Sequence, residues 1–238
     1  MVQQVEASRA ALSRDRVLQA AVALADTAGI DSVSMRKLSQ ELGVVPMALY
    51  KHVANKEELL DGMVDVVVGE IDPPRRHADW KSPADWKSAV RQRILAARRT
   101  LLRHPWASRV IESRRSPTPV VLEYMDSMIA MFRDGGFSID LTHHVMHALG
   151  SRMLGFTQEL FDDSQRLAPN AQAAGLVEMA GRYPHLVELA MAAAHEADSV
   201  VGSGCDDQFE FEFALDLQLD GFERLRQQGW SSKAPTPS

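Results

Sequence analysis

Apolar residues recur at steps of three and four along most of this chain. No alternating run of apolar and polar residues is long enough to indicate a useful strand. A period of three to four places apolar side chains on one face of an α-helix, whereas alternation would place them on one face of a strand. The sequence therefore predicts an all-helical protein.

Two helices with clear start and stop signals are expected first. The first begins near Ser13 and ends at Gly29, a residue suited to a left-handed helix cap. Its apolar stripe consists of Val17, Ala21, Leu24 and Ala28. The second helix is capped by Ser34, whose hydroxyl can accept a backbone hydrogen bond, and it ends at Gly43.

A third, short helix is expected over residues 47–53, and it carries two distinct faces. The inward stripe, spaced by four, comprises Val45, Leu49 and Val53. The second face comprises Met47, Tyr50 and Lys51. A helix that only covers a core needs the first face alone, so the second face is a candidate contact surface.

A fourth helix follows immediately, and its start is marked by a capping box. Asn55 is the expected cap, and Glu58 stands at the third helical position, where its side chain can reach back to a free backbone N–H. The helix is expected to end before Pro73.

The stretch between residues 72 and 83 is rich in proline and charge, which is typical of a connection between two units. We therefore expect a helix-turn-helix domain over 1–70, a larger helical domain over 71–230 and a disordered tail over 231–238. The larger domain should contain helices near 84–103, 119–134, 139–161 and 206–228, with helical pieces near 171–181 and 184–197. The residues expected to face inward from the first two are Val90, Ile94, Ala97, Leu101, Val121, Tyr124, Met128 and Phe132.

Composition narrows the class of protein. The single cysteine, Cys205, excludes an internal disulfide framework and a cysteine-rich zinc site, and it fits a reducing compartment. Neither a long apolar run nor a signal-peptide pattern is present, so we expect a cytoplasmic protein. The net charge is −6, yet residues 9–56 carry seven basic against four acidic side chains. Only this N-terminal segment would attract an anionic partner.

Two short helices joined by a tight glycine turn and braced by longer helices are typical of a helix-turn-helix DNA-binding unit. The second helix of such a pair lies in the major groove, and the first crosses the DNA backbone. The Tyr50 ring can contact a base and its hydroxyl a phosphate, and Lys51 and Lys56 supply positive charge. A three-helix packing unit with incidental surface lysines would show the same apolar spacing, so the spacing alone leaves both interpretations open.

Five ordered sequence blocks favour the DNA-binding interpretation. They are Gly29-Ile30, Ser34 to Ser39, Leu42 to Val44, Ala48 to Val53 and Asn55 to Leu60. In this order and spacing they resemble the TetR family of bacterial repressors. The resemblance implies an all-helical homodimer that binds a palindromic operator through its N-terminal helices and an inducer through its C-terminal body. The DNA contacts that it implies are Met35, Arg36, Met47, Ala48, Tyr50, Lys51, His52 and Lys56. Lys37 is a further candidate, because it stands at the start of the second helix, where a phosphate is favoured.

The C-terminal domain contains histidines and methionines that are candidate ligand contacts. His143 and His147 lie four apart on one expected helix, a spacing that can chelate a metal, but three histidines on one helix rarely complete a site. We therefore expect no metal and no cofactor, and we interpret these histidines as core or pocket residues. Flexible methionine side chains suit an adaptable pocket for a bulky, partly apolar ligand, although an ordinary core stripe would look the same. The candidate ligand contacts are Met125, Met128, Phe132, His143, His147, Met153 and Phe156.

The stretch from about Ala84 to Glu159 resembles, more loosely, the tetracycline-repressor branch of that family. In that repressor a histidine that binds the magnesium of the drug follows the glycine that matches Gly150, but this chain has Ser151 there. A second histidine that contacts the drug falls near Glu112. The resemblance thus implies the fold without implying magnesium-tetracycline as the inducer.

Two helices are expected to form the dimer interface. On the helix over 206–228, apolar residues occupy two sides: Phe209, Phe213 and Leu217, and then Phe211, Leu215, Leu219 and Phe222. One side can pack on the protein's own body and the other on a second copy, together with the helix over 139–161.

Two alternative functions are a small helical hydrolase and a helical protein that sequesters a ligand without acting on DNA. The hydrolase lacks support because the chain has no Gly-x-Ser-x-Gly, no phosphate-binding loop and no paired Glu-x-x-His. A ligand-sequestering function does not explain the second face of the short helix, formed by Met47, Tyr50 and Lys51. The sequence thus favours a ligand-responsive transcriptional repressor that is not an enzyme.

Overall fold

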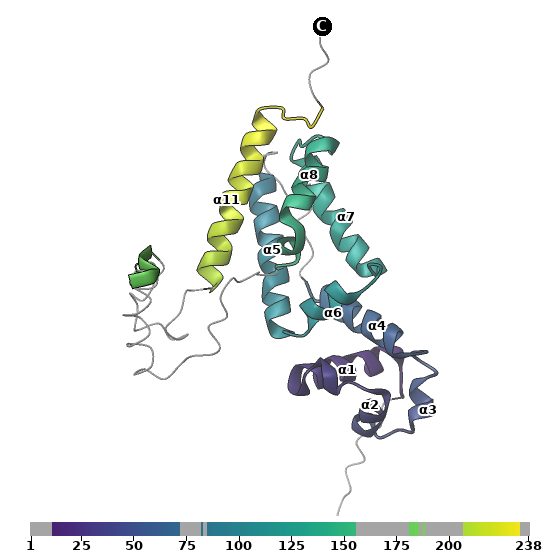
Figure 1. Cartoon of the computed structure of the whole chain (residues 1–238). Helices are drawn as coiled ribbons and strands as arrows, with labels where there is room; N and C mark the ends of the chain where they lie inside the picture. Colours follow the sequence, from purple (N-terminus) through teal and green to yellow (C-terminus); the bar gives the residue numbers. More distant parts are fainter. Residues whose placement is uncertain are drawn as a thin grey trace, which may run out of the picture. The chain divides into compact units, whose positions relative to one another are not determined.

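The computed structural model describes residues 11–71, 82, 85–155, 181–185, 188 and 207–233. Within these ranges every regular element is a helix, which confirms the predicted fold class (Figure 1). The chain divides into two compact units, Met1–Phe156 with Phe222–Ser238, and Thr157–Gly221. None of the helices within the described ranges is long and apolar enough to cross a membrane.

The first helix, α1 (Arg14–Ala28), begins and ends at the predicted signals. The Ser13 hydroxyl accepts a hydrogen bond from the Arg16 backbone N–H at 3.2 Å, and Gly29 adopts a φ of 80°. Its buried side chains are Val17, Leu18, Ala21, Val22, Leu24 and Ala25. The expected burial of Ala28 is wrong: the chain leaves the helix at Gly29, and Val33, just after the 3₁₀ turn η1 (Ile30–Ser32), is buried instead.

The helix-turn-helix pair consists of α2 (Met35–Leu42) and α3 (Pro46–Leu49). The Ser34 hydroxyl caps α2 by accepting from the Lys37 N–H, and Gly43 ends it in the left-handed region with a φ of 65°. The turn between the helices therefore depends on a residue without a Cβ.

The predicted helix over 47–53 is wrong in its extent. The regular helix begins one residue earlier, at Pro46, and stops at Leu49, after which the backbone continues in turns to a hydrogen bond from the Val53 N–H to the Leu49 carbonyl. Leu49 and Val53 are buried as predicted. Val45 is 69% exposed, because it precedes the helix as its cap and so does not share their face.

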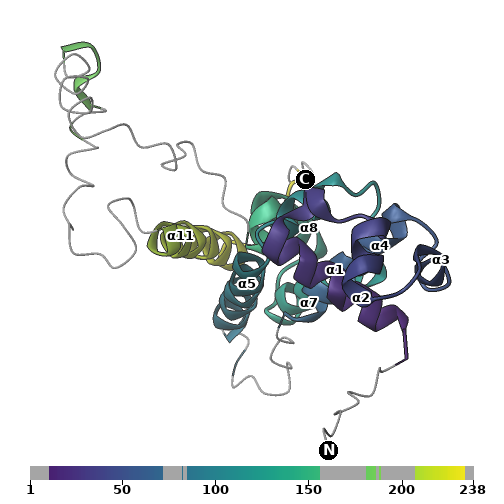
Figure 2. The ribbon, with the colours of Figure 1, turned by 90° about the horizontal axis from the view of Figure 1, so that it is seen from below.

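Helix α4 (Lys56–Gly69) packs across α1 and extends toward the C-terminal helices (Figures 1 and 2). The Asn55 side chain accepts from the Glu58 N–H at 2.9 Å, and the Glu58 carboxylate accepts from the Ala54 N–H at 2.7 Å. The capping box is therefore present, and its return bond comes from the residue before the cap. A Cβ at Gly62 would lie 2.5 Å from Leu18, so the glycine permits the close crossing of α1 and α4.

The larger body begins with α5 (Trp86–Arg103), α6 (Ala107–Ser113) and α7 (Pro119–Asp134), followed by α8 (Ile139–Leu149). All eight residues predicted to face inward from α5 and α7 are buried. Helix α6 was not predicted, because it lies between the helices expected near 84–103 and 119–134. Its burial of Ala107 and Val110 gives it a core-facing side.

The core of this body is aromatic at one end. Trp86 from α5 lies 5.5 Å from Phe132 and 4.7 Å from Phe137, measured between ring centroids. Its indole N–H donates to Glu223 at 3.0 Å. Bonds from Arg226, which outweigh the opposing effect of burial, lower the pKa of Glu223 to about 2. The C-terminal end of the last helix, α11 (Asp207–Gln227), is thereby attached to α5.

The long helix predicted over 139–161 is wrong at its C-terminal end. Helix α8 ends at Leu149, because Gly150 adopts a φ of 48° and leads into the 3₁₀ helix η4 (Gly150–Leu154). Gly155 then comes so close to Arg98 of α5 that a Cβ would lie 2.5 Å from the Arg98 Cα. Residues 156–161 lie outside the described ranges, as do most of the helical pieces predicted near 171–181 and 184–197.

Helix α11 confirms the division of apolar residues between two sides. Phe211, Leu215, Leu219 and Phe222 are buried, whereas Phe209, Phe213 and Leu217 are 54–62% exposed. The second side of the helix is thus apolar and exposed in the single chain. Residues 231–238 were expected to form a disordered tail. At the start of this stretch, however, the Ser231 and Ser232 hydroxyls both donate to the Asp140 carboxylate of α8.

Candidate nucleic-acid interface and regulatory body

The residues predicted to contact DNA lie at the surface of the N-terminal helices. Six are exposed and three are half-buried, and none is buried. The exposed six are Arg36, Lys37, Met47, Tyr50, Lys51 and Lys56, and the half-buried three are Met35, Ala48 and His52. Both ribbon views place α3 at the edge of the N-terminal group, away from α5 to α8 (Figures 1 and 2).

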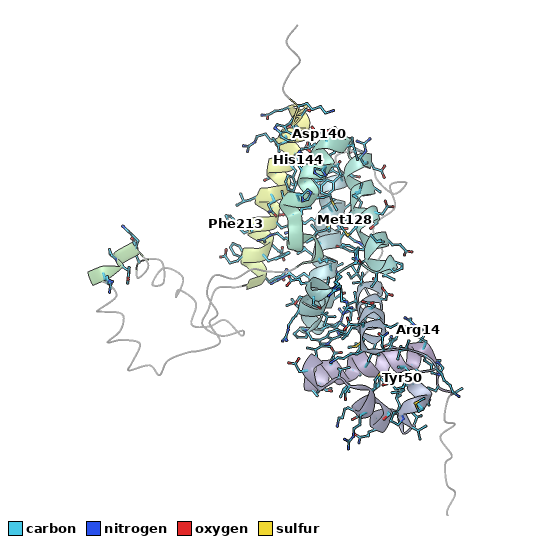
Figure 3. The ribbon with its side chains drawn as sticks, turned by 45° about the vertical axis from the view of Figure 1, so that its right-hand side comes forward. Arg14, Tyr50, Met128, Asp140, His144 and Phe213 are labelled. Atoms are coloured by element: carbon cyan, nitrogen blue, oxygen red, sulfur yellow. The ribbon has the colours of Figure 1, made fainter. Side chains whose placement is uncertain are left out.

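The geometry of α3 separates anchoring residues from outward ones. Leu49 is fully buried and fixes the helix on its neighbours, whereas Met47 is 71% and Tyr50 45% exposed. Figure 3 shows Tyr50 among the N-terminal helices. Because the inner face holds the helix in place, the outer face needs no contact within the chain and can dock into a groove.

Among the described residues, the basic side chains on and beside this face are mostly without acidic partners. Lys37 forms an exposed ion pair with Glu41 at 3.6 Å. For Arg36, Lys51 and Lys56 no ion pair is found within the part of the chain that the structure describes. Charges of this kind can neutralise phosphates without first breaking an internal pair.

The predicted ligand contacts do not form one cluster. Met128, Phe132 and Met153 are buried and Met125 is half-buried, but His143 and His147 are exposed. The reason is the register of α8, whose inward positions are taken by Leu141, Val145 and Leu149. Phe156 lies outside the described ranges. Figure 3 shows Met128 within the body.

The histidines of α8 contact one another edge to face rather than surround a site. The ring centroids of His143 and His147 are 4.6 Å apart, and His144 lies 3.8 Å from the Asp140 carboxylate. Hydrogen bonds from Ser232 lower the pKa of Asp140 to about 2. Among the residues that the structure describes, no three His, Cys, Asp or Glu side chains are grouped so that they could hold a metal ion.

The body contains two buried arginines, Arg93 and Arg98, that the sequence did not predict. Arg93 lies over the Tyr124 ring at 4.5 Å from its centroid, and Arg98 donates to the Gly155 carbonyl at 3.3 Å. Tyr124 donates to the Met153 carbonyl at 2.8 Å, and its burial raises the pKa of the phenol above its usual range. The only signal for the two arginines was their position next to the inward stripe of α5.

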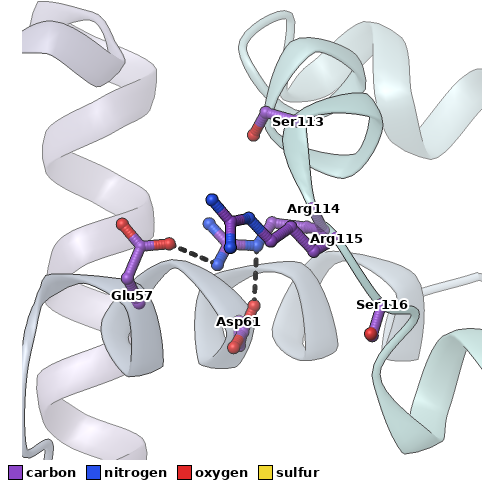
Figure 4. A pocket seen from close by; sticks show the side chains of 6 residues that line it. All are labelled: Glu57, Asp61, Ser113, Arg114, Arg115 and Ser116. Carbon is purple, nitrogen blue, oxygen red and sulfur yellow. Dashed lines mark hydrogen bonds and ion pairs between the residues drawn. The ribbon is translucent and has the colours of Figure 1, made fainter.

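A polar cleft of about 500 Å³ lies between α4 and the connection from α6 to α7 (Figure 4). It is lined by Glu57, Asp61, Ser113, Arg114, Arg115 and Ser116. The Arg114 side chain, only 13% exposed, lies 2.5 Å from the Glu57 carboxylate and 2.8 Å from that of Asp61. We call this contact the Arg114 bridge. It joins the body to the first turns of α4, the helix that directly follows α3.

The chain was compared with known proteins. A model of the bacterial regulatory proteins of the tetR family matches residues 17–63, and a model of the tetracyclin repressor-like C-terminal domain matches residues 81–226. The transcriptional repressor DrrR1 of Streptomyces coeruleorubidus is 30% identical over 94% of this chain and 82% of its own length. The class D tetracycline repressor protein of Escherichia coli is 28% identical over 91% of this chain and 97% of its own.

Solved structures agree with these matches. Apo ActR from Streptomyces coelicolor has a TM-score of 0.71 at 26% identity, and it covers 93% of this chain and 99% of its own. ActR, described as a TetR family protein, in complex with (S)-DNPA has a TM-score of 0.67 at 28% identity, over 90% and 98% of the two chains. With both halves of the chain matched, this protein belongs to the TetR family of bacterial regulatory proteins.

Proposed function

We propose that this regulator is a homodimeric repressor that binds a palindromic operator and leaves it when a small molecule enters its body. The single observation that carries the proposal is the α2–Gly43–α3 unit, with its buried Leu49 and its exposed face of Met47, Tyr50 and Lys51. Arg36, Lys37 and Lys56 would contact phosphates beside this face, and Met35, Ala48 and His52 would lie at its edges. Because it acts on bacterial DNA, we place it in the cytoplasm, and we assign it a regulatory rather than an enzymatic role.

The proposed division of labour follows the two matched segments. Residues 1–70 would bind DNA, and residues 71–230 would bind the ligand and the second copy. The named relatives support a ligand-binding body: one is a tetracycline repressor, and ActR was solved with (S)-DNPA. We propose a bulky, partly apolar inducer that contacts Met125, Met128, Phe132, Met153 and Phe156, with His143 and His147 as polar contacts.

The proposed dimer interface uses residues 139–161 and 206–228. Exposed apolar side chains support it on both helices, namely Ile139 on α8 and Phe209, Phe213 and Leu217 on α11. A second copy would remove this apolar surface from water. Two-fold symmetry would also place two α3 helices in successive major grooves, about 34 Å apart.

The Arg114 bridge supports a route from body to DNA. A ligand that shifts the α6–α7 connection would displace the Arg114 guanidinium and with it Glu57 and Asp61 on α4. Since α3 precedes α4 directly, such a shift would change the distance between the paired recognition helices. The ligand achieves this only by binding the released form more tightly, with a coupling free energy of about 1–3 kcal/mol in typical cases.

A footprint of the purified protein on the DNA upstream of its own coding region tests the proposal. We expect two protected half-sites related by two-fold symmetry, with centres about one helical turn apart. The same DNA with the half-sites scrambled serves as the control. A complete lack of protection on upstream DNA would support the ligand-sequestering alternative instead.

A further inference from the structure

The first residues of α3 form an exposed apolar surface. Val45, the residue that precedes the helix as its cap, is 69% exposed, and Met47 is 71% exposed. Pro46, between them, is exposed as well. Within the ranges that the structure describes, no other large aliphatic or aromatic side chain is more exposed than Val45 or Met47. We call Val45, Pro46 and Met47 the α3 apolar patch.

The backbone holds the α3 apolar patch at the surface. The Val45 carbonyl accepts a hydrogen bond from the Ala48 N–H at 2.9 Å, which closes the first turn of the helix. The ring of Pro46 fixes the backbone φ of that residue. The fully buried side chain of Leu49 then attaches α3 to the neighbouring helices. The patch is therefore formed before a partner binds, so binding requires little further ordering of the chain.

The side chains of the patch are unsuited to hydrogen-bonded base contacts. Valine and proline side chains have neither a donor nor an acceptor, and the thioether of methionine is only a weak acceptor. In the major groove, guanine, adenine and cytosine present hydrogen-bond donors and acceptors, whereas thymine also presents an apolar C5-methyl group. The thymine methyl is therefore the base-edge group whose chemistry matches the patch, because contact removes apolar surface of both partners from water.

The charged residues near the patch favour DNA as its partner. Tyr50 and Lys51, which follow Met47 on the same short segment, are exposed. Arg36 is exposed at the start of α2, and Lys56 is exposed at the start of α4. An apolar protein surface would not compensate these positive charges, whereas DNA offers phosphates to them and methyl groups to the patch. In a helix-turn-helix unit the first residues of the second helix are also those that reach base edges.

We propose that Val45 and Met47 contact thymine methyl groups in the major groove, so that each operator half-site presents thymine to the first residues of α3. The proposal rests on the proposed function, because it requires α3 to lie in the major groove. It adds Val45 to the DNA contacts, although the sequence assigned this residue to the inward stripe. It also names the base that the α3 apolar patch selects.

The experiment replaces thymine by uracil in the operator that the footprint defines. Uracil pairs with adenine as thymine does and lacks only the C5-methyl group. One thymine position at a time is changed symmetrically in both half-sites, and affinity is measured by fluorescence anisotropy at fixed salt. At the thymines that face the patch we expect binding to weaken by about threefold to fivefold for each methyl group removed, and therefore by about tenfold or more for the symmetric pair.

A double variant, with Val45→Ala and Met47→Ala, identifies the side chains that contact the methyl group. Both side chains are exposed, so their truncation should leave the unfolding midpoint close to that of the wild type. The double variant should bind the thymine and uracil operators with nearly equal affinity. Leu122→Ala is the matched control, because Leu122 is 52% exposed on α7 of the body, and it should keep the wild-type affinity ratio. If the double variant binds too weakly for a ratio to be measured, Val45→Ala alone should still lower that ratio.

Three results would overturn the inference. Equal affinity of the wild type for the thymine and uracil operators at every position would show that no methyl group is read. A ratio that persists in the double variant would assign the effect to other residues or to the stiffness of the DNA. Protected half-sites that contain no thymine would also contradict the inference. A wild type that binds no operator would overturn the proposed function together with this inference, whereas retained binding with equal affinities would overturn this inference alone.

Discussion

The basic side chains that follow α3 and those of the junction between α4 and the body differ in how they are paired. Lys51 and Lys56 are exposed and have no ion pair among the residues that the structure describes. Arg114 and His104, in contrast, are largely buried, and each lies between two carboxylates. Both groups are basic, so sequence composition alone does not distinguish them.

This difference distinguishes the charged side chains that are available to bind a partner from those that stabilise the fold. A solvated cation keeps its charge available for a phosphate, and exposed charges contribute little to folding stability. A buried cation has lost its water and requires its acidic partners to compensate. We therefore expect substitutions at the two places to affect different measurements.

The largest difference in folding stability is expected between substitutions of two methionines, one buried in the body and one exposed on α3. Met128→Ala should lower the free energy of unfolding by about 2–5 kcal/mol, because it leaves a cavity in the body at a fully buried position. Met47→Ala, at a position 71% exposed, should change it by less than about 0.5 kcal/mol and act on operator preference instead. Urea unfolding of both variants measures the difference. Similar losses of stability in both would contradict the assignment of Met47 to a contact surface.

A smaller difference in folding stability is expected between substitutions of the neighbours Arg114 and Arg115, which line the same cleft (Figure 4). Arg114→Ala should lower the free energy of unfolding by about 1–2 kcal/mol, between the values for exposed and buried ion pairs, because Glu57 and Asp61 retain access to water. Arg115→Ala removes the same charge without breaking the bridge and should cost less than about 0.5 kcal/mol. Equal costs would show that the Arg114 bridge is not structurally significant.

The same pair of variants also tests the proposed route from inducer to DNA. Arg114→Ala should still bind the operator but should require more inducer for release, whereas Arg115→Ala should respond as the wild type does. An unchanged response in Arg114→Ala would place the coupling elsewhere.

Local signals predicted much of the fold because they act within a few residues. Ser34 and Asn55 cap their helices as predicted, α1 begins beside Ser13 as predicted, and Gly29 and Gly43 end two of the helices. The inward stripes of α5 and α7 were predicted in full from apolar spacing. The end of α8 was not, because a glycine inside an apolar stretch is tolerated in many helices, and only the positive φ at Gly150 makes it a stop.

The junction could not be predicted, because its contacts join residues far apart in the sequence. His104 meets Asp26 across 78 positions and Glu70 across 34, and Arg114 meets Glu57 across 57. No periodicity records such pairs. The candidate DNA contacts were accessible to sequence analysis for the opposite reason, since they lie together on consecutive short elements and depend on no distant partner.

The most direct test of the central claim is the operator affinity of Tyr50→Ala beside that of Tyr183→Ala. Both tyrosines are 45% exposed, so the two substitutions remove comparable surface side chains. At fixed salt, we expect Tyr50→Ala to weaken binding by about tenfold or more, which corresponds to ~1.4 kcal/mol, while it remains a folded dimer. Tyr183→Ala should bind as the wild type does. Equal affinities for Tyr50→Ala and the wild type would contradict the assignment of α3 as the helix that recognises DNA.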